Sequence, residues 1–204
     1  MEKSELLARM ADGRLYDSSD PRLQGDQAER LDRVFRYNQL PPSCQAEKAA
    51  LLRELFAEIG DGCYIETPFH ANWGGKNVHF GSGVYANFNL TLVDDGEIRV
   101  GSHVMIGPNV VLTTAGHPVE PSLRRRAVQY NLPISIGDNV WLGAGCLVMP
   151  GVTIGENSVI GAGSVVTRDI PANVVAVGVP CRVLRPIGPR DRQFYHRDLP
   201  VDFE

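Results

Sequence analysis

An aliphatic residue recurs every six positions through the second half of this 204-residue chain. One run holds Val100, Ile106 and Leu112, and a second holds Ile136, Leu142, Val148, Ile154, Ile160 and Val166. The two runs are in phase, because Leu112 and Ile136 stand 24 positions apart. An α-helix or a flat strand does not produce a period of six, whereas a coil of short parallel strands joined by tight turns does. The sequence therefore predicts a mainly β protein built as a parallel β-helix. The period leaves its handedness open, and the general rule for parallel crossovers favours a right-handed coil.

Changes in the residue pattern divide the chain into three predicted parts. Residues 1–62 show helical periodicity: Asp20 and Pro21 begin a helix, whose apolar face holds Leu31, Val34 and Phe35. Residues 63–171 carry the β-helix, and residues 172–204 form a polar tail that is rich in arginine. We expect the helices and the tail to cover the two ends of the coil.

Composition limits the partners and the compartment. The formal net charge of −4 argues against general nucleic-acid binding, which requires a basic surface. The four cysteines show no paired spacing, which favours a reduced, cytoplasmic protein. The amino terminus has no signal-peptide pattern, and no run of 18 apolar residues is present, so we expect no membrane partner.

Residues 113–133 interrupt the hexads, and the phase resumes afterwards. Such an insertion in a solenoid maps to a loop extruded from one corner, often on the binding face. The loop holds His117 between Gly116 and Pro118. An imidazole exchanges protons near neutral pH, so His117 is the candidate general base. From position alone, the alternative is a loop histidine that only bonds a carbonyl.

Six segments resemble the hexapeptide-repeat sugar O-acetyltransferases, above all those acting on galactosides, with the maltose and nodulation-factor enzymes close behind. The segments run from Tyr85 to Thr91, Val93 to Asp95, Gly116 to Val119, Asn139 to Gly143, Pro150 to Gly155 and Gly178 to Arg182. The resemblance covers almost the whole chain. It implies a left-handed β-helix, against the usual crossover rule, and a homotrimer with active sites between subunits. It also implies acetyl-CoA as the acetyl donor and a sugar or glycoside as the acceptor.

The resemblance also implies roles for individual residues. His117 would deprotonate the acceptor hydroxyl, which would attack the thioester directly, and the amide of Ala144 would lie near the thioester. The acceptor-contact positions match or adjoin Asp17, Asn72, Tyr85, Asn87 and Asp95. Gln129 stands where the galactoside enzyme has an apolar residue, so acceptor preference can differ. For Asn and Asp the alternative is a solvated turn residue.

Coenzyme A needs a groove for its pantetheine arm and cations for its phosphates. The positions implied for cofactor binding are Trp141, Gly143, Ala144, Ala162, Thr167, Arg168, Arg182 and Arg185. The small residues among them also suit the turns of the coil, and the arginines suit a solvated surface. Guanidinium groups match phosphate oxygens in geometry.

Two other functions remain open from the sequence. Some β-helices are zinc enzymes with three histidine ligands, and His79, His103 and His117 are the candidates for such a site. Their spacings do not resemble that family, and we expect no metal. The second alternative is a scaffold without activity, which would have no reason to break its coil with a loop bearing a Gly-His-Pro motif.

Overall fold

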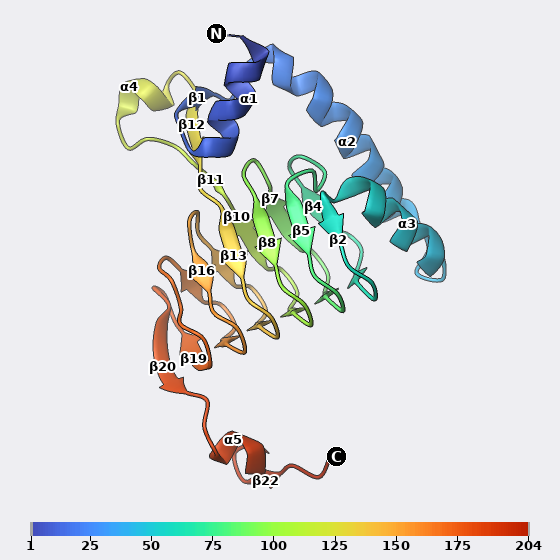
Figure 1. Ribbon diagram of the computed structural model, residues 1–204, viewed down its shortest axis with the longest axis vertical. Coiled ribbons are helices and arrows are strands. Elements are labelled where there is room, and N and C mark those ends of the chain that lie inside the picture. Colours follow the sequence, from blue (N-terminus) through green and yellow to red (C-terminus); the bar gives the residue numbers. More distant parts are fainter. Residues whose placement is uncertain (1, 204) are drawn as a thin grey trace.

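The computed structural model describes residues 2–203, and a parallel β-helix forms its body (Figure 1). The expected coil of short parallel strands is confirmed. The first face holds β2 (Glu58–Ile59), β5 (Val78–Phe80), β8 (Ile98–Val100), β13 (Ile134–Ile136) and β16 (Thr153–Ile154). The second face holds β3 (Tyr64–Ile65), β6 (Tyr85–Ala86), β9 (Met105–Ile106), β14 (Trp141–Leu142), β17 (Val159–Ile160) and β19 (Val174–Val177). The third face holds β4 (His70–Ala71), β7 (Thr91–Val93), β10 (Val111–Thr113), β15 (Leu147–Val148) and β18 (Val165–Val166).

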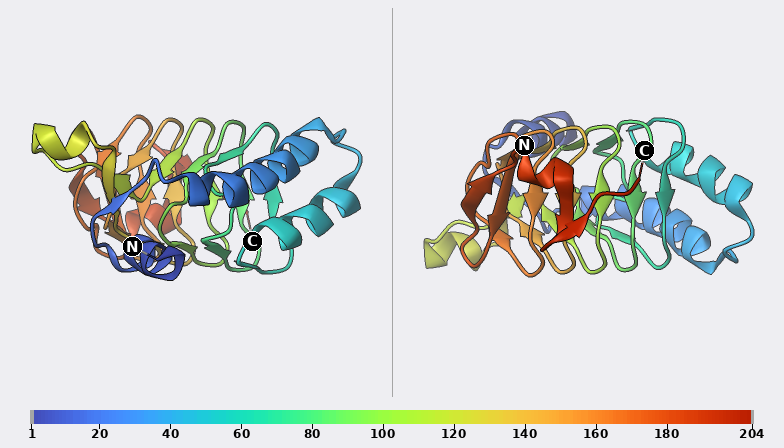
Figure 2. Two further views of the ribbon diagram at one scale, coloured as in Figure 1. Left: turned by 90° about the horizontal axis from the view of Figure 1, so that it is seen from above. Right: turned by 90° about the horizontal axis from the view of Figure 1, so that it is seen from below.

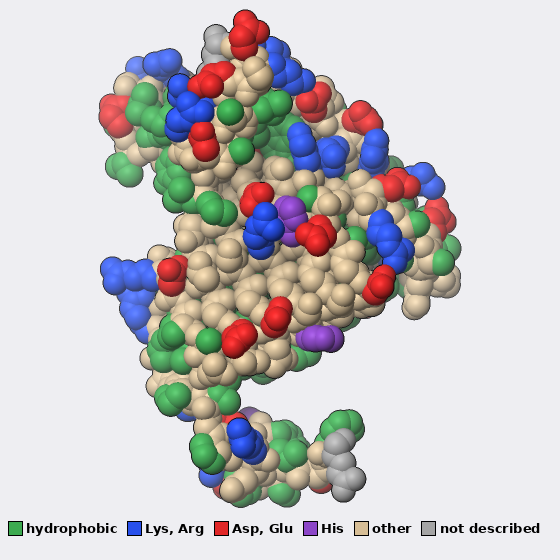
Figure 3. Space-filling model, viewed as in Figure 1, with side chains coloured by type: hydrophobic (Ala, Val, Ile, Leu, Met, Phe, Trp, Pro, Cys, Tyr) green, Lys and Arg blue, Asp and Glu red, His purple; other side chains and the backbone are tan. Residues whose placement is uncertain are grey.

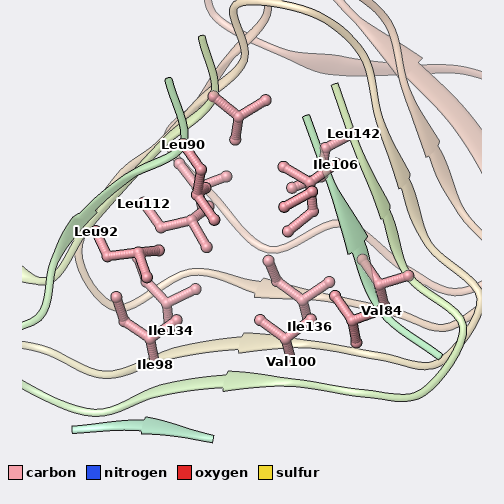
Figure 4. Packing of buried hydrophobic residues seen from close by; sticks show 14 of the residues in the cluster. Val84, Leu90, Leu92, Ile98, Val100, Ile106, Leu112, Ile134, Ile136 and Leu142 are labelled. Carbon is pink, nitrogen blue, oxygen red and sulfur yellow. The ribbon is translucent and has the colours of Figure 1, made fainter. Parts of the chain in front are cut away.

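The hexad residues stack in register to form the core. On the second face Leu142 pairs with Ile106 on one side and with Ile160 on the other, and all three are buried. Figure 4 shows such side chains converging on the coil axis from the three faces. Each turn of the coil therefore contributes one aliphatic layer, and stability accumulates between neighbouring turns.

The glycine that follows many hexad residues is needed for close stacking. A Cβ atom on Gly143 would lie 2.6 Å from the amide nitrogen of Ala162 in the next turn. A Cβ atom on Gly137 would lie 2.6 Å from the amide of Glu156. Successive turns would have to separate to admit any larger residue at these corners.

Three helices precede most of the coil: α1 (Lys3–Asp12), α2 (Pro21–Gln39) and α3 (Gln45–Leu55). Asp20 caps α2 by accepting a hydrogen bond from the amide of Arg22 at 3.0 Å, as predicted. Phe56, just after α3, packs edge-on against Phe80 of the first face. Figure 2 shows α2 and α3 at the beginning of the coil, at the opposite end from β20 (Arg182–Pro186).

The predicted extruded loop is confirmed and is partly ordered as a small sheet. It leaves the corner between the third and first faces, and contains β11 (Ala115–Gly116), α4 (Pro121–Arg124) and β12 (Val128–Asn131). Strand β1 (Tyr16–Asp17), from far earlier in the chain, pairs with β12 in antiparallel fashion. This sheet connects the amino-terminal segment to the loop.

The chain ends in an arm that contacts mainly itself. Strand β20 folds back on β19, and α5 (Arg190–Gln193) and the hairpin of β21 (Phe194–His196) and β22 (Leu199–Pro200) follow. In Figures 1 and 3 this arm projects beyond the last turns of the coil. Within residues 2–203, no helix is long and apolar enough to cross a membrane.

Candidate active site

The extruded loop fixes the ring of His117. Gly116 pairs with Tyr130 across the hairpin, and His117 follows where the strand ends. The Nδ1 atom of His117 lies 2.8 Å from the carbonyl oxygen of Val128. A carbonyl oxygen only accepts hydrogen bonds, so Nδ1 donates and the neutral ring keeps its lone pair on Nε2. The bond to Val128 thus prepares the exposed imidazole to accept a proton at Nε2.

Asp95 follows β7 at the corner from which the loop departs, and it is 7% exposed. Its Oδ1 atom accepts hydrogen bonds from Trp73 Nε1 at 3.2 Å and from Gln129 Nε2 at 3.1 Å. Its Oδ2 atom accepts from Asn72 Nδ2 at 2.8 Å. These three neutral donors, from the segment after β4 and from β12, hold the carboxylate in one orientation.

Asp94, the neighbour of Asp95, turns into the protein. Its carboxylate accepts the backbone amides of Trp73 at 2.6 Å and Gly75 at 2.9 Å. Burial raises its pKa to about 6, against the opposing effect of these two hydrogen bonds. Asp94 therefore anchors the segment after β4, while the carboxylate of Asp95 binds the side chains that meet at the corner.

Asp17 lies on the outer strand of the small sheet, opposite Val128, whose carbonyl holds His117. Its side chain is exposed and accepts hydrogen bonds from the amide and the hydroxyl of Ser19. The structure thus gathers five predicted residues around one corner of the coil. This group, called the loop corner below, consists of Asp17, Asn72, Asp95, His117 and Gln129.

Two buried residues that bond to the loop corner, Asn131 and Tyr16, were not identified as site residues from the sequence. Asn131 donates from Nδ2 to the carbonyl oxygens of Met10 at 3.0 Å and Asp95 at 3.2 Å. The hydroxyl of Tyr16 lies 3.2 Å from the same Nδ2 atom, and burial raises the pKa of this phenol. The alternation of polar Gln129 and Asn131 within β12 was the available signal, since residues two apart share a face of a strand.

The remaining predicted residues lie elsewhere on the same chain. Tyr85 and Trp141 point outward from the second face and are exposed. The turn from the second to the third face carries Asn87, Gly143, Ala144 and Ala162. These six residues are called the second-face group below.

Two backbone amides in the turns of the second-face group, those of Ala144 and Ala162, are available to donate hydrogen bonds to a ligand. Among residues 2–203, none accepts a hydrogen bond from the amide of Ala144 or of Ala162. Both residues are exposed and small, so a ligand can approach their backbone. Such amides suit the carbonyl oxygens of a pantetheine arm or a developing oxyanion.

The cations predicted to meet phosphates lie toward the end of the coil. Thr167 and Arg168 follow β18 and are exposed, and Arg182 and Arg185 lie on the exposed strand β20. Asp191 binds Arg185 through two ion-pair contacts of 2.7 and 2.8 Å, and this guanidinium lowers the pKa of Asp191 to about 2. A phosphate at Arg185 would therefore share this cation with Asp191.

The arrangement disfavours a zinc site of three histidines. His79 lies on the first face beside Glu58, and His103 lies on the turn from the first to the second face. His117 lies on the extruded loop, so the three rings belong to different parts of the coil. Throughout the described part of the chain, no three His, Cys, Asp or Glu side chains are grouped as metal ligands.

Comparison with known proteins agrees with this geometry. The family model "Bacterial transferase hexapeptide (six repeats)" matches residues 133–168, and "Maltose acetyltransferase hexapeptide capping motif" matches residues 9–60. A galactoside O-acetyltransferase of Lactococcus lactis is 52% identical over 204 residues, which is 100% of this chain and 99% of that protein.

Two solved structures share the whole architecture. A galactoside acetyltransferase in complex with coenzyme A superposes with a TM-score of 0.92 at 43% identity, covering 100% of both chains. A maltose O-acetyltransferase from Clostridium difficile gives 0.87 at 38% identity, covering 90% of this chain and 97% of that one. With this identity over its full length, the chain belongs to the hexapeptide-repeat family of galactoside and maltose O-acetyltransferases.

Proposed function

We propose that this protein transfers the acetyl group of acetyl-CoA to a hydroxyl of a sugar or glycoside, with His117 as general base. The observation that carries the proposal is the bond from His117 Nδ1 to the Val128 carbonyl, which leaves Nε2 to take a proton. The family supports the chemistry, because its members include galactoside and maltose O-acetyltransferases, one of them solved with coenzyme A.

His117 acts twice in this reaction. Its Nε2 atom accepts the proton of the acceptor hydroxyl while that oxygen attacks the thioester carbonyl. The free amide of Ala144 donates to the oxyanion that forms. When the carbon–sulfur bond breaks, the protonated ring returns its proton to the departing thiolate.

Direct attack needs no acyl-enzyme, and the cysteines support this. Cys146 and Cys181 are buried in the coil, where burial raises the pKa of both thiols. Burial also raises the pKa of Cys63, which makes its thiolate scarce. All four cysteines are free, which supports the cytoplasm as the compartment.

We assign acceptor binding to the loop corner, joined by Tyr85 and Asn87 of the second-face group. We assign cofactor binding to the rest of the second-face group, with Arg168, Arg182 and Arg185 for the phosphates. In one chain these groups occupy different corners of the coil, separated by one face. A side of six residues spans on the order of 15–20 Å, which is too far for transfer of an acetyl group. We therefore propose a homotrimer, in which the loop corner of one subunit faces the second-face group of the next.

The test is an assay of coenzyme A release from acetyl-CoA with a panel of acceptors, including galactosides, glucose and maltose, combined with sedimentation analysis. We expect acceptor-dependent release by a species of three chains. Absence of acceptor-dependent release across the panel would contradict the proposed reaction. An active monomer would contradict the assembly alone.

A further inference from the structure

The apolar face predicted for α2 is only partly covered within one chain. Val34 is buried at 5% exposure, whereas Leu31 is 42% and Phe35 is 66% exposed. The sequence places these three residues on one face of the helix, and within one chain only Val34 of the three is buried. Two large apolar side chains remain in solvent beside the third face of the coil.

Two hydrogen-bonded contacts hold α2 along strand β4 and leave a groove between them. Near one end Gln27 Nε2 donates to the carbonyl of Asn72 at 2.8 Å. Near the other, Asn38 Nδ2 donates to the carbonyl of Phe69 at 2.8 Å, and its Oδ1 atom accepts from the Phe69 amide. The groove measures about 580 Å³, and its lining includes Leu31, Val34, Phe35, His70, Asn72 and Val93.

A turn elsewhere on the chain carries an exposed aromatic side chain, Phe88, which could fill such an apolar groove. Phe88 lies between β6 and β7, on the corner of the second and third faces, and is 50% exposed. Asn87 Oδ1 accepts the Phe88 amide at 2.7 Å. Asn89 bonds through its amide to the Pro68 carbonyl and through its side chain to Asn109. These bonds fix the turn on both sides of the exposed ring.

We propose that Phe88 of a second copy of this chain occupies the groove between α2 and the third face. The ring would contact Leu31 and Phe35, covering the exposed part of α2. This inference rests on the proposed trimer and identifies what seats one subunit on the next. Aromatic side chains seated in a pocket dominate interface energetics, and the half of Phe88 that is exposed in one chain would be covered.

The groove and the turn that bears Phe88 lie at the same level along the axis of the coil. Strands β4 and β7, which form the floor of the groove, are neighbours on the third face. The turn bearing Phe88 leads directly into β7, so it lies at the same level. Rotation about an axis parallel to the coil keeps every residue at its height. It therefore carries the Phe88 turn of one copy to the groove level of the next.

Seating Phe88 would also complete the acceptor site. Asn87 of the incoming turn would arrive beside Asn72 at the end of the groove. Asn72 donates to Asp95 at 2.8 Å, so the incoming amide would join the loop corner. The loop corner would gain this amide only from a second copy, because Asn87 and Asp95 lie at different corners of one chain.

Disulfide trapping tests the contact without reference to activity. Phe88→Cys is combined with Leu31→Cys in one variant and with Phe35→Cys in another, and the purified proteins are oxidised. We expect covalent dimers and trimers on a non-reducing denaturing gel for at least one double variant. Each single variant and the wild type, whose native cysteines are the control, should stay monomeric on that gel.

A substitution pair supplies the second measurement. Phe88→Asp should weaken subunit association at least about tenfold in sedimentation, because a carboxylate would enter the apolar groove. Phe203→Asp is the matched control, since Phe203 is 91% exposed on the terminal arm, and it should leave association unchanged.

The outcomes separate this contact from the proposed reaction. Failure of both double variants to form linked chains, or unchanged association of Phe88→Asp, would overturn the contact even if the wild type transfers acetyl groups. Linked chains from a double variant, together with a wild type that transfers no acetyl group, would retain the contact and overturn the reaction.

Discussion

At the scale of single residues, the bond between His117 and Val128 gives the most direct prediction. His117→Ala should lower the rate of acetyl transfer at least about 100-fold, the usual effect of losing a general base. Acetyl-CoA affinity, measured by calorimetry, should change little because the second-face group is untouched. His79→Ala is the control, because this ring lies beside Glu58 on the first face and belongs to neither the loop corner nor the second-face group. A decrease of less than tenfold in a folded His117→Ala protein would remove His117 from this role.

Asp94 gives a prediction about stability and pH. Its carboxyl has an ordinary pKa of 3.8, and burial raises the pKa in the folded protein to about 6. Between these values the folded state binds more protons than the unfolded state, so the free energy of unfolding falls as pH rises. The decrease attributable to Asp94 is about 2 kcal/mol between pH 4 and pH 7. Asp94→Asn should lack this component.

Urea denaturation of wild type and Asp94→Asn at matched protein concentration measures the difference. Other titrating groups are common to both proteins and cancel in the comparison. The wild type should lose stability relative to the variant as pH rises through about 6. Parallel pH profiles would show that Asp94 is not protonated in the folded state.

The location of Gln129 could be predicted from the sequence, but the orientation of its side chain could not. Its place at the site was predictable, because it stands in the extruded loop near the Gly-His-Pro motif. Its orientation was not, because Nε2 donates both to Asp95 and to the hydroxyl of Tyr16, which pairs with Gln129 across β1 and β12. That pairing joins segments more than 100 positions apart, and no local period encodes it.

At the scale of elements, asparagines at the coil corners stabilise the turns. Asn157 has a φ of 58°, donates to Asn173 at 3.1 Å and accepts from Asn139 at 3.0 Å. Asn157→Gly removes these bonds but tolerates the left-handed backbone, whereas Asn157→Ala removes them and adds strain. The Ala variant should be less stable than the Gly variant by about 1 kcal/mol in chemical denaturation. An Ala variant as stable as the Gly variant would refute this account of the corner.

The coil itself was predictable for a physical reason. Each layer depends on spacing within the sequence, as when Ile106 stacks on Leu142 and Leu142 on Ile160. The period therefore specifies which residues point inward without any knowledge of distant contacts. The outer side of α2 was not predictable in this way, because helical periodicity marks Leu31 and Phe35 as apolar but does not say which chain covers them.

At the scale of the whole molecule, the two groups of functional residues lie on opposite ends of one face. The loop corner holds the base and the acceptor-contact candidates, and the second-face group holds the free amides of Ala144 and Ala162. In the proposed trimer, a second chain brings these two groups together without any change in the coil. Catalysis in the proposed trimer is therefore a property of the assembly, and the stacked layers of each coil fix one half of the site.

Complementation between two inactive chains tests this claim most directly. His117→Ala removes the base, and Ala144→Trp blocks the exposed turn of the second-face group; each protein alone should be inactive. In trimers assembled at random from equal amounts of both chains, about a quarter of the interfaces pair an intact loop corner with an intact second-face group. Mixed trimers should therefore recover about a quarter of the wild-type acetyl transfer. Mixed trimers as inactive as their parents would contradict a site shared between subunits.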